Sequence, residues 1–451
     1  MSALARFFKQ RGDSVCGYDH TASPLTRQLE AEGIEVHYDD NPEKIPSDID
    51  LCIYTPAVPK ETSEYQYIAS KSIPICKRSQ VLGELTRGKK CIAVAGSHGK
   101  TTTSGLIAHL LRSANIPTSA FLGGISKNIG SNMCYNPHSE YVVVEADEYD
   151  RSFLQLYPHY SVITSTDPDH LDIYGSHANL LQAFLQYAKQ TDATGHLFIN
   201  KNSSLLKHCM EGKTSLTNCL TCQTSQYGGI HSQAEYRAER LHIDNGTISF
   251  DYIAPNGNSL QNLKLYRSAP YNVENAVAAI AVAQQCGASE KQIKEGLATF
   301  TGIQRRFDYR VSNANIIYID DYAHHPAEIA ASIQSARTLF PNKRIVGIFQ
   351  PHLYSRTADF ADDFAKVLST LDGIVMMDIY PAREHPLPGV TSQMVLDKIA
   401  NINKRLCTKE EIPSIISELQ ADVLMTLGAG DIDRIVPEIE KHLTQNTTTH
   451  K

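Results

Sequence analysis

Short apolar runs alternate along this chain with stretches whose apolar residues recur every three or four positions. Residues 14–18, 34–38 and 50–54 have the length and composition of buried strands, whereas residues 2–11 and 24–32 have helical spacing. The alternation of strands and helices predicts an α/β fold with parallel sheets and crossover helices. In open sheets of this kind, ligands bind at the carboxyl ends of the strands.

One stretch has the pattern of a phosphate loop. Residues 91–95 predict a buried strand, residues 106–111 predict a helix, and between them the sequence reads Gly96-Ser97-His98-Gly99-Lys100-Thr101-Thr102-Thr103. The glycines let backbone N–H groups surround phosphate oxygens, Lys100 can reach the outer phosphates, and Thr101 offers a hydroxyl to magnesium. Val94 occupies the first glycine position of the full pattern, so this is a shortened form that predicts nucleotide binding without specifying a reaction.

Polar side chains follow the next two predicted strands. The run at residues 141–144 ends in Glu145-Ala146-Asp147-Glu148, and the run at residues 160–164 leads to Asp169-His170-Leu171-Asp172. Parallel strands end at one edge of a sheet, so we expect these groups beside the phosphate loop. Glu145 and His170 are candidates to hold or orient Mg²⁺, which prefers oxygen ligands in nucleotide sites. The other acidic residues are expected to support them: Asp147, Glu148, Asp169 and Asp172.

The middle of the chain predicts two hairpins and a long apolar helix. Asn245-Gly246 and Asn256-Gly257 are hairpin signals beside the apolar runs 248–253 and 260–265. A helix is expected to run from about residue 271 to 286, and asparagine near its start could bind an adenine edge or cap the helix. Farther on, Arg305-Arg306 is either a phosphate-binding pair or a solvated pair of charges.

The last third of the chain places polar loops after four predicted strands, at residues 316–319, 344–349, 373–377 and 423–427. This regular placement indicates a single binding edge. The length of 451 residues, at about 150 residues per domain, favours three domains. We place them at residues 1–88, 89–307 and 308–451.

Composition narrows the class of protein. The chain is 42% hydrophobic and 20% charged, and it has no apolar run near the roughly 18 residues of a membrane span. No secretion signal is visible at the start, so we expect a cytoplasmic protein without membrane insertion. The net charge of −7 argues against nucleic acid as the main partner. Ten scattered cysteines are expected to be reduced and mostly buried.

Seven motifs follow one another along nearly the whole chain. The first two are the phosphate loop at residues 96–103 and the acidic run at residues 145–148. The others are Asp169-His170-Leu171-Asp172, Arg305-Arg306-Phe307, Asp320-Asp321-Tyr322-Ala323-His324-His325-Pro326, Gln350-Pro351-His352 with Ser355-Arg356-Thr357, and Gly428-Ala429-Gly430-Asp431. As an ordered set they are highly specific, and they resemble the motifs of the Mur ligases of peptidoglycan synthesis.

This resemblance implies three α/β domains: a Rossmann-like UDP-sugar domain, a central P-loop ATPase-like domain and a Rossmann-like carboxyl-terminal domain for the amino acid. It implies an ATP-dependent carboxylate–amine ligase with Mg²⁺ as cofactor. The lactyl carboxylate of UDP-N-acetylmuramate would attack the γ-phosphate of ATP to give an acyl phosphate, and L-alanine would then displace phosphate to form an amide. Phosphorylation supplies a leaving group, so the site must neutralise phosphate charge.

The resemblance also assigns roles to residues. The implied catalytic residues are Lys100, Glu145, His170, Arg306 and Arg356. The implied ATP-binding residues are Gly96, Ser97, His98, Gly99, Lys100, Thr101, Thr102, Asn275, Asp321 and His324. The implied magnesium ligands are Thr101, Glu145 and His170. The implied substrate-binding residues are Asn128, Asn132, His352 and Arg356, and Arg356 would pair with a carboxylate.

The chain departs from the family pattern in three places. Leu353 stands where the family often has arginine, so only Arg356 is carried over from that loop. No lysine follows His170 until Lys189, so no carbamylated lysine is expected. The family's opening strand and glycine loop, which hold the UDP diphosphate, would precede Met1. We therefore expect the UDP-sugar domain of this chain to lack them, through a late start codon or a weak UDP-sugar site.

Two other functions would share most of these motifs. A recycling ligase would join a preformed tripeptide to UDP-N-acetylmuramate, and a non-catalytic regulator would use nucleotide binding alone. Joint retention of Lys100, Glu145, His170 and Arg306 disfavours the regulator, because a regulator does not need the whole charge-neutralising set. The expected assembly is a monomer or a weak homodimer acting in cell wall biogenesis.

Overall fold

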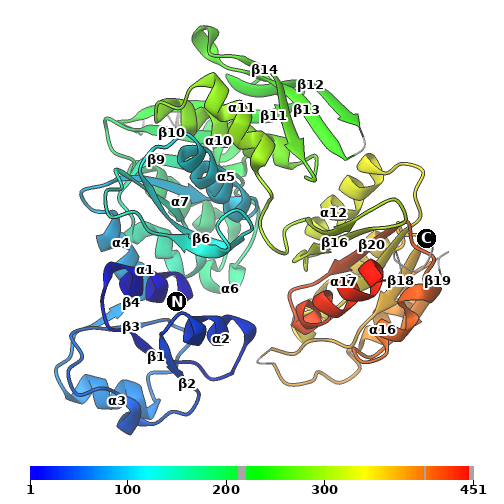
Figure 1. Ribbon diagram of the computed structural model, residues 1–451, viewed down its shortest axis with the longest axis horizontal. Helices are drawn as coiled ribbons and strands as arrows, with labels where there is room; N and C mark the ends of the chain where they lie inside the picture. Colours follow the sequence, from blue (N-terminus) through cyan, green and yellow to red (C-terminus); the bar gives the residue numbers. More distant parts are fainter. Residues whose placement is uncertain (212–219, 245, 383, 401–402, 446–451) are drawn as a thin grey trace. The chain divides into compact units, whose positions relative to one another are not determined.

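The computed structural model describes residues 1–211, 220–244, 246–382, 384–400 and 403–445 (Figure 1). This part of the chain forms two compact units. The first contains Met1–Arg240, Phe250–Leu263 and Glu274–Phe300, and the second contains Leu241–Ser249, Lys264–Val273 and Thr301–Lys451. Among the described helices, none has the length and apolar character required to cross a membrane.

The amino-terminal part of the first unit consists of short strands and helices. β1 (Cys16–Tyr18) pairs in parallel with β2 (Glu35–His37), and β3 (Cys52–Tyr54) pairs in parallel with β4 (Ile75–Lys77). No strand among the described residues joins β1 to β3, so the two pairs are separate sheets. The helical elements here are α1 (Ser2–Arg11), α2 (Pro24–Ala31), η1 (Pro42–Lys44), α3 (Ser63–Ser70) and α4 (Arg78–Thr86).

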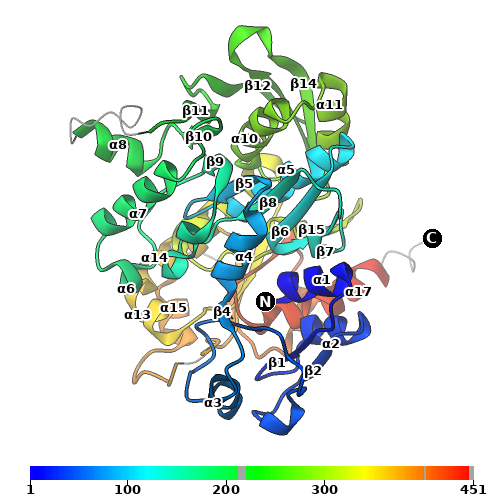
Figure 2. The ribbon, with the colours of Figure 1, turned by 90° about the vertical axis from the view of Figure 1, so that its left-hand side faces the viewer.

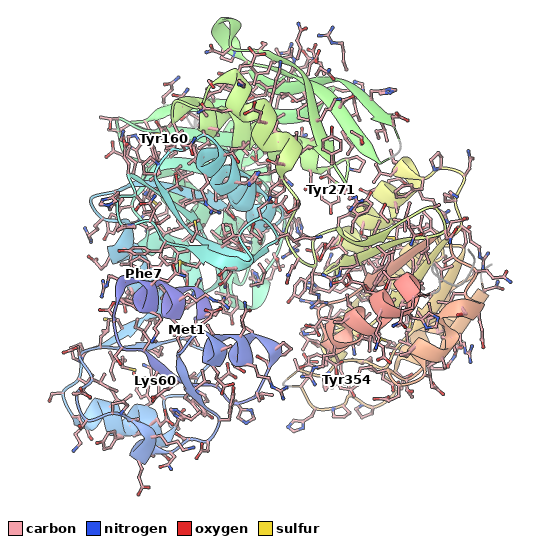
Figure 3. All side chains as sticks on the ribbon, in the orientation of Figure 1. Met1, Phe7, Lys60, Tyr160, Tyr271 and Tyr354 are labelled. Atoms are coloured by element: carbon pink, nitrogen blue, oxygen red, sulfur yellow. The ribbon has the colours of Figure 1, made fainter. Side chains whose placement is uncertain are left out.

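Helix α1 is fixed within this unit by an aromatic contact and a buried guanidinium. The ring of Phe7, labelled in Figure 3, lies 5.3 Å from the ring of Phe121 between centroids. Arg6 is only 2% exposed, and its guanidinium donates to both carboxylate oxygens of Glu32 and to Asn132 Oδ1 at 2.8 Å. A buried charge is tolerated only with such a complete set of partners.

A larger sheet follows, with strand order β14-β13-β12-β11-β10-β9-β5-β8-β6-β7. β5 pairs in parallel with both β8 and β9, so the loops after these three strands lie beside one another. The strands are β5 (Lys90–Ala95), β6 (Thr118–Ser126), β7 (Ser131–Cys134), β8 (Tyr141–Glu145), β9 (Pro158–Ile163), β10 (His196–Asn200), β11 (Gln223–Ile230), β12 (Tyr236–Asp244), β13 (Thr247–Ile253) and β14 (Leu260–Tyr266). The associated helical elements are α5 (Lys100–Ser113), η2 (Tyr149–Gln155), α6 (Leu171–Tyr174), α7 (His177–Lys189), α8 (Ser204–Glu211), η3 (Pro255–Gly257), α10 (Asn272–Gln285) and α11 (Glu290–Thr299).

Helices cover both faces of β5, which explains why this strand is apolar throughout. Cys91, Ala93 and Ala95 belong to a buried cluster with side chains of α4 and α7. Ile92 and Val94 alternate with them and are also fully buried. Figure 2 shows α7 and α5 on opposite sides of β5 and β8. A parallel strand buried on both faces reads as a continuous apolar run, as this one does.

The second unit is built on a sheet of strand order β15-β16-β20-β17-β18-β19, in which only the β15–β16 pair is antiparallel. One face packs against α16, η4, η5 and α17 through residues such as Ile348, Leu424 and Ile439. The strands are β15 (Asp308–Ser312), β16 (Ile317–Asp321), β17 (Ile345–Phe349), β18 (Gly373–Met376), β19 (Asn403–Leu406) and β20 (Val423–Leu427). The helical elements are α12 (Pro326–Leu339), α13 (Tyr354–Asp359), α14 (Ala361–Leu368), α15 (Ser392–Lys398), α16 (Ile412–Ile415), η4 (Ile416–Glu418), η5 (Asp431–Arg434) and α17 (Val436–Gln445).

The predicted α/β class is confirmed, and the predicted apolar strands occur within about two residues of their expected bounds. The sequence pattern predicted no strand at β4, β6, β7, β10, β11, β12, β15 or β19. Of these, Ser131–Cys134 (β7) and Asn403–Leu406 (β19) are short and carry polar or charged residues at the sheet edges. Of the two hairpin signals, Asn245 lies outside the described residues. Asn256-Gly257 lies in η3, between the sheet neighbours β13 and β14.

His196 makes the stability of the first unit depend on pH. It begins β10, is 2% exposed, and stacks on Phe198 with ring centroids 4.1 Å apart. Neither ring nitrogen has a hydrogen-bond partner among the described residues. Burial lowers the pKa of His196 from 6.5 to about 4. The imidazole is therefore neutral in the folded protein at pH values where it is protonated in the unfolded chain.

We expect His196→Leu to reduce the acid sensitivity of folding. The His196 contribution is fully present above pH 6.5 and is lost as the pH falls towards 4, because only the unfolded chain takes up the proton in that interval. The loss amounts to about 3 kcal/mol, at about 1.4 kcal/mol per pH unit. Urea unfolding at pH 7.5 and pH 4.5 measures it. His138→Leu, at an exposed position, is the control, and equal pH dependence in wild type and His196→Leu would contradict the prediction.

Candidate active site

The loop between β5 and α5 lies against the carboxyl end of β9. His98 N donates to Ser165 Oγ at 2.8 Å. Gly96 and Gly99 have φ angles of +139° and +83°, which favour glycine. A Cβ on Gly96 would overlap Thr164 Oγ1 and lie 2.8 Å from Ser165 N. The glycines predicted from the motif are therefore required by backbone conformation and, at Gly96, by space.

The other predicted residues of this loop lie at the start of α5 or beside it. Ser97 Oγ donates to the carbonyl oxygen of Asp167 at 2.8 Å, which ties the loop to the segment after β9. Thr101 and Thr102 are both buried in the first turn of α5. Their backbone N–H groups belong to the positive end of the helix, where anions are stabilised.

Lys100 forms a buried ion pair with Glu148 and also bonds to the glycine loop. Its Nζ donates to Gly96 O at 2.6 Å and to the two carboxylate oxygens of Glu148 at 2.9 and 2.8 Å. The Lys100 side chain is 14% exposed and that of Glu148 is 0% exposed. Burial alone would lower the pKa of Lys100, but the negative charges of Glu148 and Glu145 raise it above its usual value. The ammonium is therefore held charged beside the glycine loop.

Glu145 ends β8, and a glycine of β6 makes room for its carboxylate. Gly123 N donates to Glu145 Oε2 at 3.0 Å. A Cβ on Gly123 would overlap both carboxylate oxygens and lie 2.5 Å from Cδ. Any larger residue at position 123 would displace the carboxylate. The absence of a side chain at Gly123 therefore leaves the space that the Glu145 carboxylate occupies.

His170 lies with two carboxylates in the same region. Glu148, Asp169 and His170 offer ligand atoms within 4.8 Å of one another, and no other such group is found in the described part of the chain. His170 Nε2 lies 3.8 Å from Glu148 Oε1 and 3.6 Å from Asp169 Oδ2. Tyr174 Oη donates to Glu148 O at 2.5 Å and holds that backbone in place. Carboxylate oxygens with one imidazole are a donor set suited to a divalent cation.

Three predicted asparagines have protein partners. Asn275 Oδ1 accepts from Thr103 Oγ1 at 3.2 Å, so Asn275 lies against α5, close to Gly99. Asn128 Nδ2 donates to Thr299 O at 2.8 Å. Asn132 links β7 to α1, because it accepts from Arg6 and donates to Ser2 Oγ at 3.0 Å. Of the three, Asn275 is the one described in contact with the phosphate-loop region.

In the second unit, the guanidinium groups of the two adjacent arginines, Arg305 and Arg306, each lie 5.1 Å from the ring centroid of Tyr322. Arg305 also donates to Gly428 O at 2.5 Å and lies 3.5 Å from Asp320. Asp321 accepts from Ser332 Oγ at 2.7 Å, and burial raises the pKa of Asp321 to about 6.

The remaining predicted residues of the second unit are His324, His352 and Arg356. The rings of His324 and His352 lie 6.1 Å apart, and His352 stacks on Tyr380. Burial lowers the pKa of His352 to about 4, and the charge of Arg356 contributes to this shift. His352 Nδ1 and Arg356 Nη1 are buried without hydrogen-bond partners among the described residues. Such atoms are expected where the polar groups of a ligand would bind.

The sequence alone ranked Glu148 only as a supporting residue, and it did not indicate that Gly123 contacts Glu145. The structure places Glu148 in direct contact with Lys100 and Gly123 in direct contact with Glu145. The acidic run after β8 was the available signal for Glu148. The spacing of its carboxylates could not tell which of them faces the lysine, because the chain leaves the strand at Glu145 and enters the irregular η2 turn.

A glycine loop with a paired lysine, at the end of a strand that has a parallel neighbour on each side, defines an α/β protein of the nucleotide-phosphate-binding class. Three family models divide the chain in order. The description "Mur ligase family, catalytic domain" matches residues 1–90, "Mur ligase middle domain" matches 94–283, and "Mur ligase, glutamate ligase domain" matches 305–432. The chain belongs to the Mur ligase family, whose members are ATP-dependent ligases.

Individual proteins are similar over nearly the whole chain. UDP-N-acetylmuramate--L-alanine ligase of Phocaeicola vulgatus is 46% identical over 97% of this chain and 94% of its own length. The enzyme of the same name from Porphyromonas gingivalis is 45% identical over 98% of this chain and 96% of its own length. The crystal structure of UDP-N-acetylmuramate-alanine ligase from Thermotoga maritima has a TM-score of 0.84 and 28% identity, covering 99% of this chain and 97% of its own.

Proposed function

We propose that this chain is an ATP-dependent ligase that joins L-alanine to UDP-N-acetylmuramate. One observation carries the proposal. Proteins named for this reaction are 45–46% identical to the chain over at least 97% of its length. Family models for three domains match the chain. We propose that the domain boundaries lie near residues 88 and 307.

The reaction has two steps. The lactyl carboxylate attacks the γ-phosphorus of ATP, the bond from that phosphorus to the bridging oxygen breaks, and ADP leaves. The amine of L-alanine then attacks the acyl carbon, the bond from carbon to the phosphate oxygen breaks, and the amine loses a proton as the amide forms. Both steps build negative charge on phosphate oxygens, so cationic and N–H groups must surround them.

Residues of the first unit would meet the phosphates. Gly96, Gly99 and the first turn of α5 offer backbone N–H groups, and Lys100 offers an ammonium held charged by its neighbours. We propose that Thr101, Glu145 and His170 hold Mg²⁺. His170 belongs to a cluster of donors suited to this ion, whose other members are Glu148 and Asp169, and the negative charge of Glu145 acts on the adjacent Lys100. Bound magnesium would neutralise phosphate charge during transfer.

Residues of the second unit would meet the nucleotide and the amino acid. Asp321 and His324 lie at the end of β16 and in the loop that follows it, and the Arg306 guanidinium lies over the ring of Tyr322 in that loop. Arg356 and His352 carry buried atoms that have no hydrogen-bond partner in the described part of the chain, so they are suited to the carboxylate of L-alanine. Arg356 would pair with that carboxylate through its guanidinium.

Phosphate release with ATP, UDP-N-acetylmuramate and either L-alanine or a preformed tripeptide tests the proposal. We expect release that requires L-alanine, with formation of UDP-N-acetylmuramoyl-L-alanine in equal amount by mass spectrometry. Preference for the tripeptide would replace the proposal with the recycling reaction. Nucleotide binding without turnover on any acceptor would favour a regulator.

A further inference from the structure

The helix that carries Arg356 has no capping side chain of its own. α13 begins after Leu353, whose side chain cannot accept a hydrogen bond and whose φ angle of 71° is a conformation that favours glycine. The first turn of α13, where Figure 3 labels Tyr354, therefore depends on tertiary contacts for its position. These contacts come from the loop after β18.

Backbone bonds join the two loops. Tyr380 N donates to Pro351 O at 2.9 Å, and Leu353 N donates to Tyr380 O at 2.9 Å. The ring of His352 stacks on that of Tyr380, with an interplanar angle of 17°. Tyr380 thus holds the backbone on both sides of His352, directly before the strained residue Leu353.

Glu384, four residues after Tyr380, supplies the missing cap. Its Oε2 accepts from Ser355 N at 3.0 Å, and its other carboxylate oxygen accepts from Ser355 Oγ. The backbone of Tyr354 also favours the charged carboxylate, and these bonds outweigh burial and lower the pKa of Glu384. A carboxylate at the first turn of a helix satisfies free N–H groups and interacts favourably with the helix dipole.

We infer that Glu384 is the positioning residue for Arg356, and that by capping α13 it sets the affinity of the site for the carboxylate of the amino-acid substrate. The inference rests on the proposed function, in which Arg356 pairs with that carboxylate. Nη1 of Arg356 is buried without a hydrogen-bond partner among the described residues, so this guanidinium is available to a carboxylate. The orientation of a single guanidinium then decides how well a carboxylate is bound.

The test measures the KM of each substrate and kcat for Glu384→Ala. The KM for L-alanine is expected to rise about tenfold, as the loss of one good helix cap allows, while kcat at saturating L-alanine and the KM for ATP stay within about twofold. Glu384→Gln keeps an acceptor oxygen and is expected to recover part of the affinity. Ser355→Ala removes only the hydroxyl bond of an exposed residue and is expected to show a smaller increase.

Glu411→Gln is the matched control. Glu411 also accepts from a backbone N–H in the same unit, that of Thr408 at 2.8 Å, and its substitution is expected to leave the KM for L-alanine unchanged. An unchanged KM for L-alanine in Glu384→Ala, or an equal increase in every KM, would overturn the role of Glu384. Absence of L-alanine-dependent phosphate release in the wild type would instead overturn the proposed function.

Discussion

Lys100→Met is expected to reduce L-alanine-dependent phosphate release by at least about 10³-fold, because it removes the cation that would meet the transferred phosphate. The same substitution leaves Glu148, which is 0% exposed, without its 2.8 Å ammonium partner. An unpaired buried carboxylate costs about 3 kcal/mol or more. We therefore expect a lower free energy of unfolding at pH 7.5 as well as lost turnover.

A double substitution separates these two effects. Lys100→Met with Glu148→Gln removes both charges, so most of the lost stability is expected to return while turnover does not. Phosphate release and urea unfolding measure the two quantities. Lys90→Met is the control, because Lys90 pairs with the exposed Glu140 and contributes about 1 kcal/mol or less. Turnover within tenfold of wild type in Lys100→Met would contradict the assigned role.

Gly123→Ala is expected to lower kcat by about 10²-fold and to raise the Mg²⁺ concentration needed for half-maximal rate. The added Cβ would overlap both carboxylate oxygens of Glu145, so the carboxylate must leave its position beside Gly123 N. Initial rates over a range of Mg²⁺ concentrations, at fixed ATP, measure both effects.

A second substitution, in Glu145, tests the same contact between Gly123 and Glu145. Glu145→Asp withdraws the carboxylate by one methylene, so Gly123→Ala with Glu145→Asp is expected to be more active than Gly123→Ala alone. Gly17→Ala is the control, because no heavy atom lies within 4 Å of a Cβ built there. Normal magnesium dependence in Gly123→Ala would show that Glu145 has no part in metal binding.

Local patterns were sufficient to predict most of the strands and the phosphate loop. The strand at residues 91–95 is apolar at every position because helices cover both faces of β5, so its character is visible without any knowledge of its neighbours. Gly96 and Gly99 are glycines because their φ angles are positive, which is a local requirement. β19 was not predicted because its four residues are exposed at the edge of the sheet, so they show no apolar pattern.

The candidate site was only partly predictable, because the contacts between its side chains depend on how the chain folds. The sequence indicated that carboxylates follow β8, but the choice between Glu145 and Glu148 as the partner of Lys100 depends on how the chain turns after the strand. It indicated that Arg356 would lie in a substrate loop. It gave no sign that a carboxylate 28 positions later, at Glu384, caps the helix that carries this arginine.

The sequence by itself determined the α/β class, the phosphate loop and the family, because these depend on periodicity, on backbone conformations that only glycine adopts easily, and on motifs in a fixed order. Tertiary structure alone decided the partner of each charged group: Lys100 with Glu148, Glu145 with Gly123, and α13 with Glu384. Electrostatic and hydrogen-bond partners are set by distances of about 3 Å between segments far apart in sequence. Only the folded chain fixes such distances.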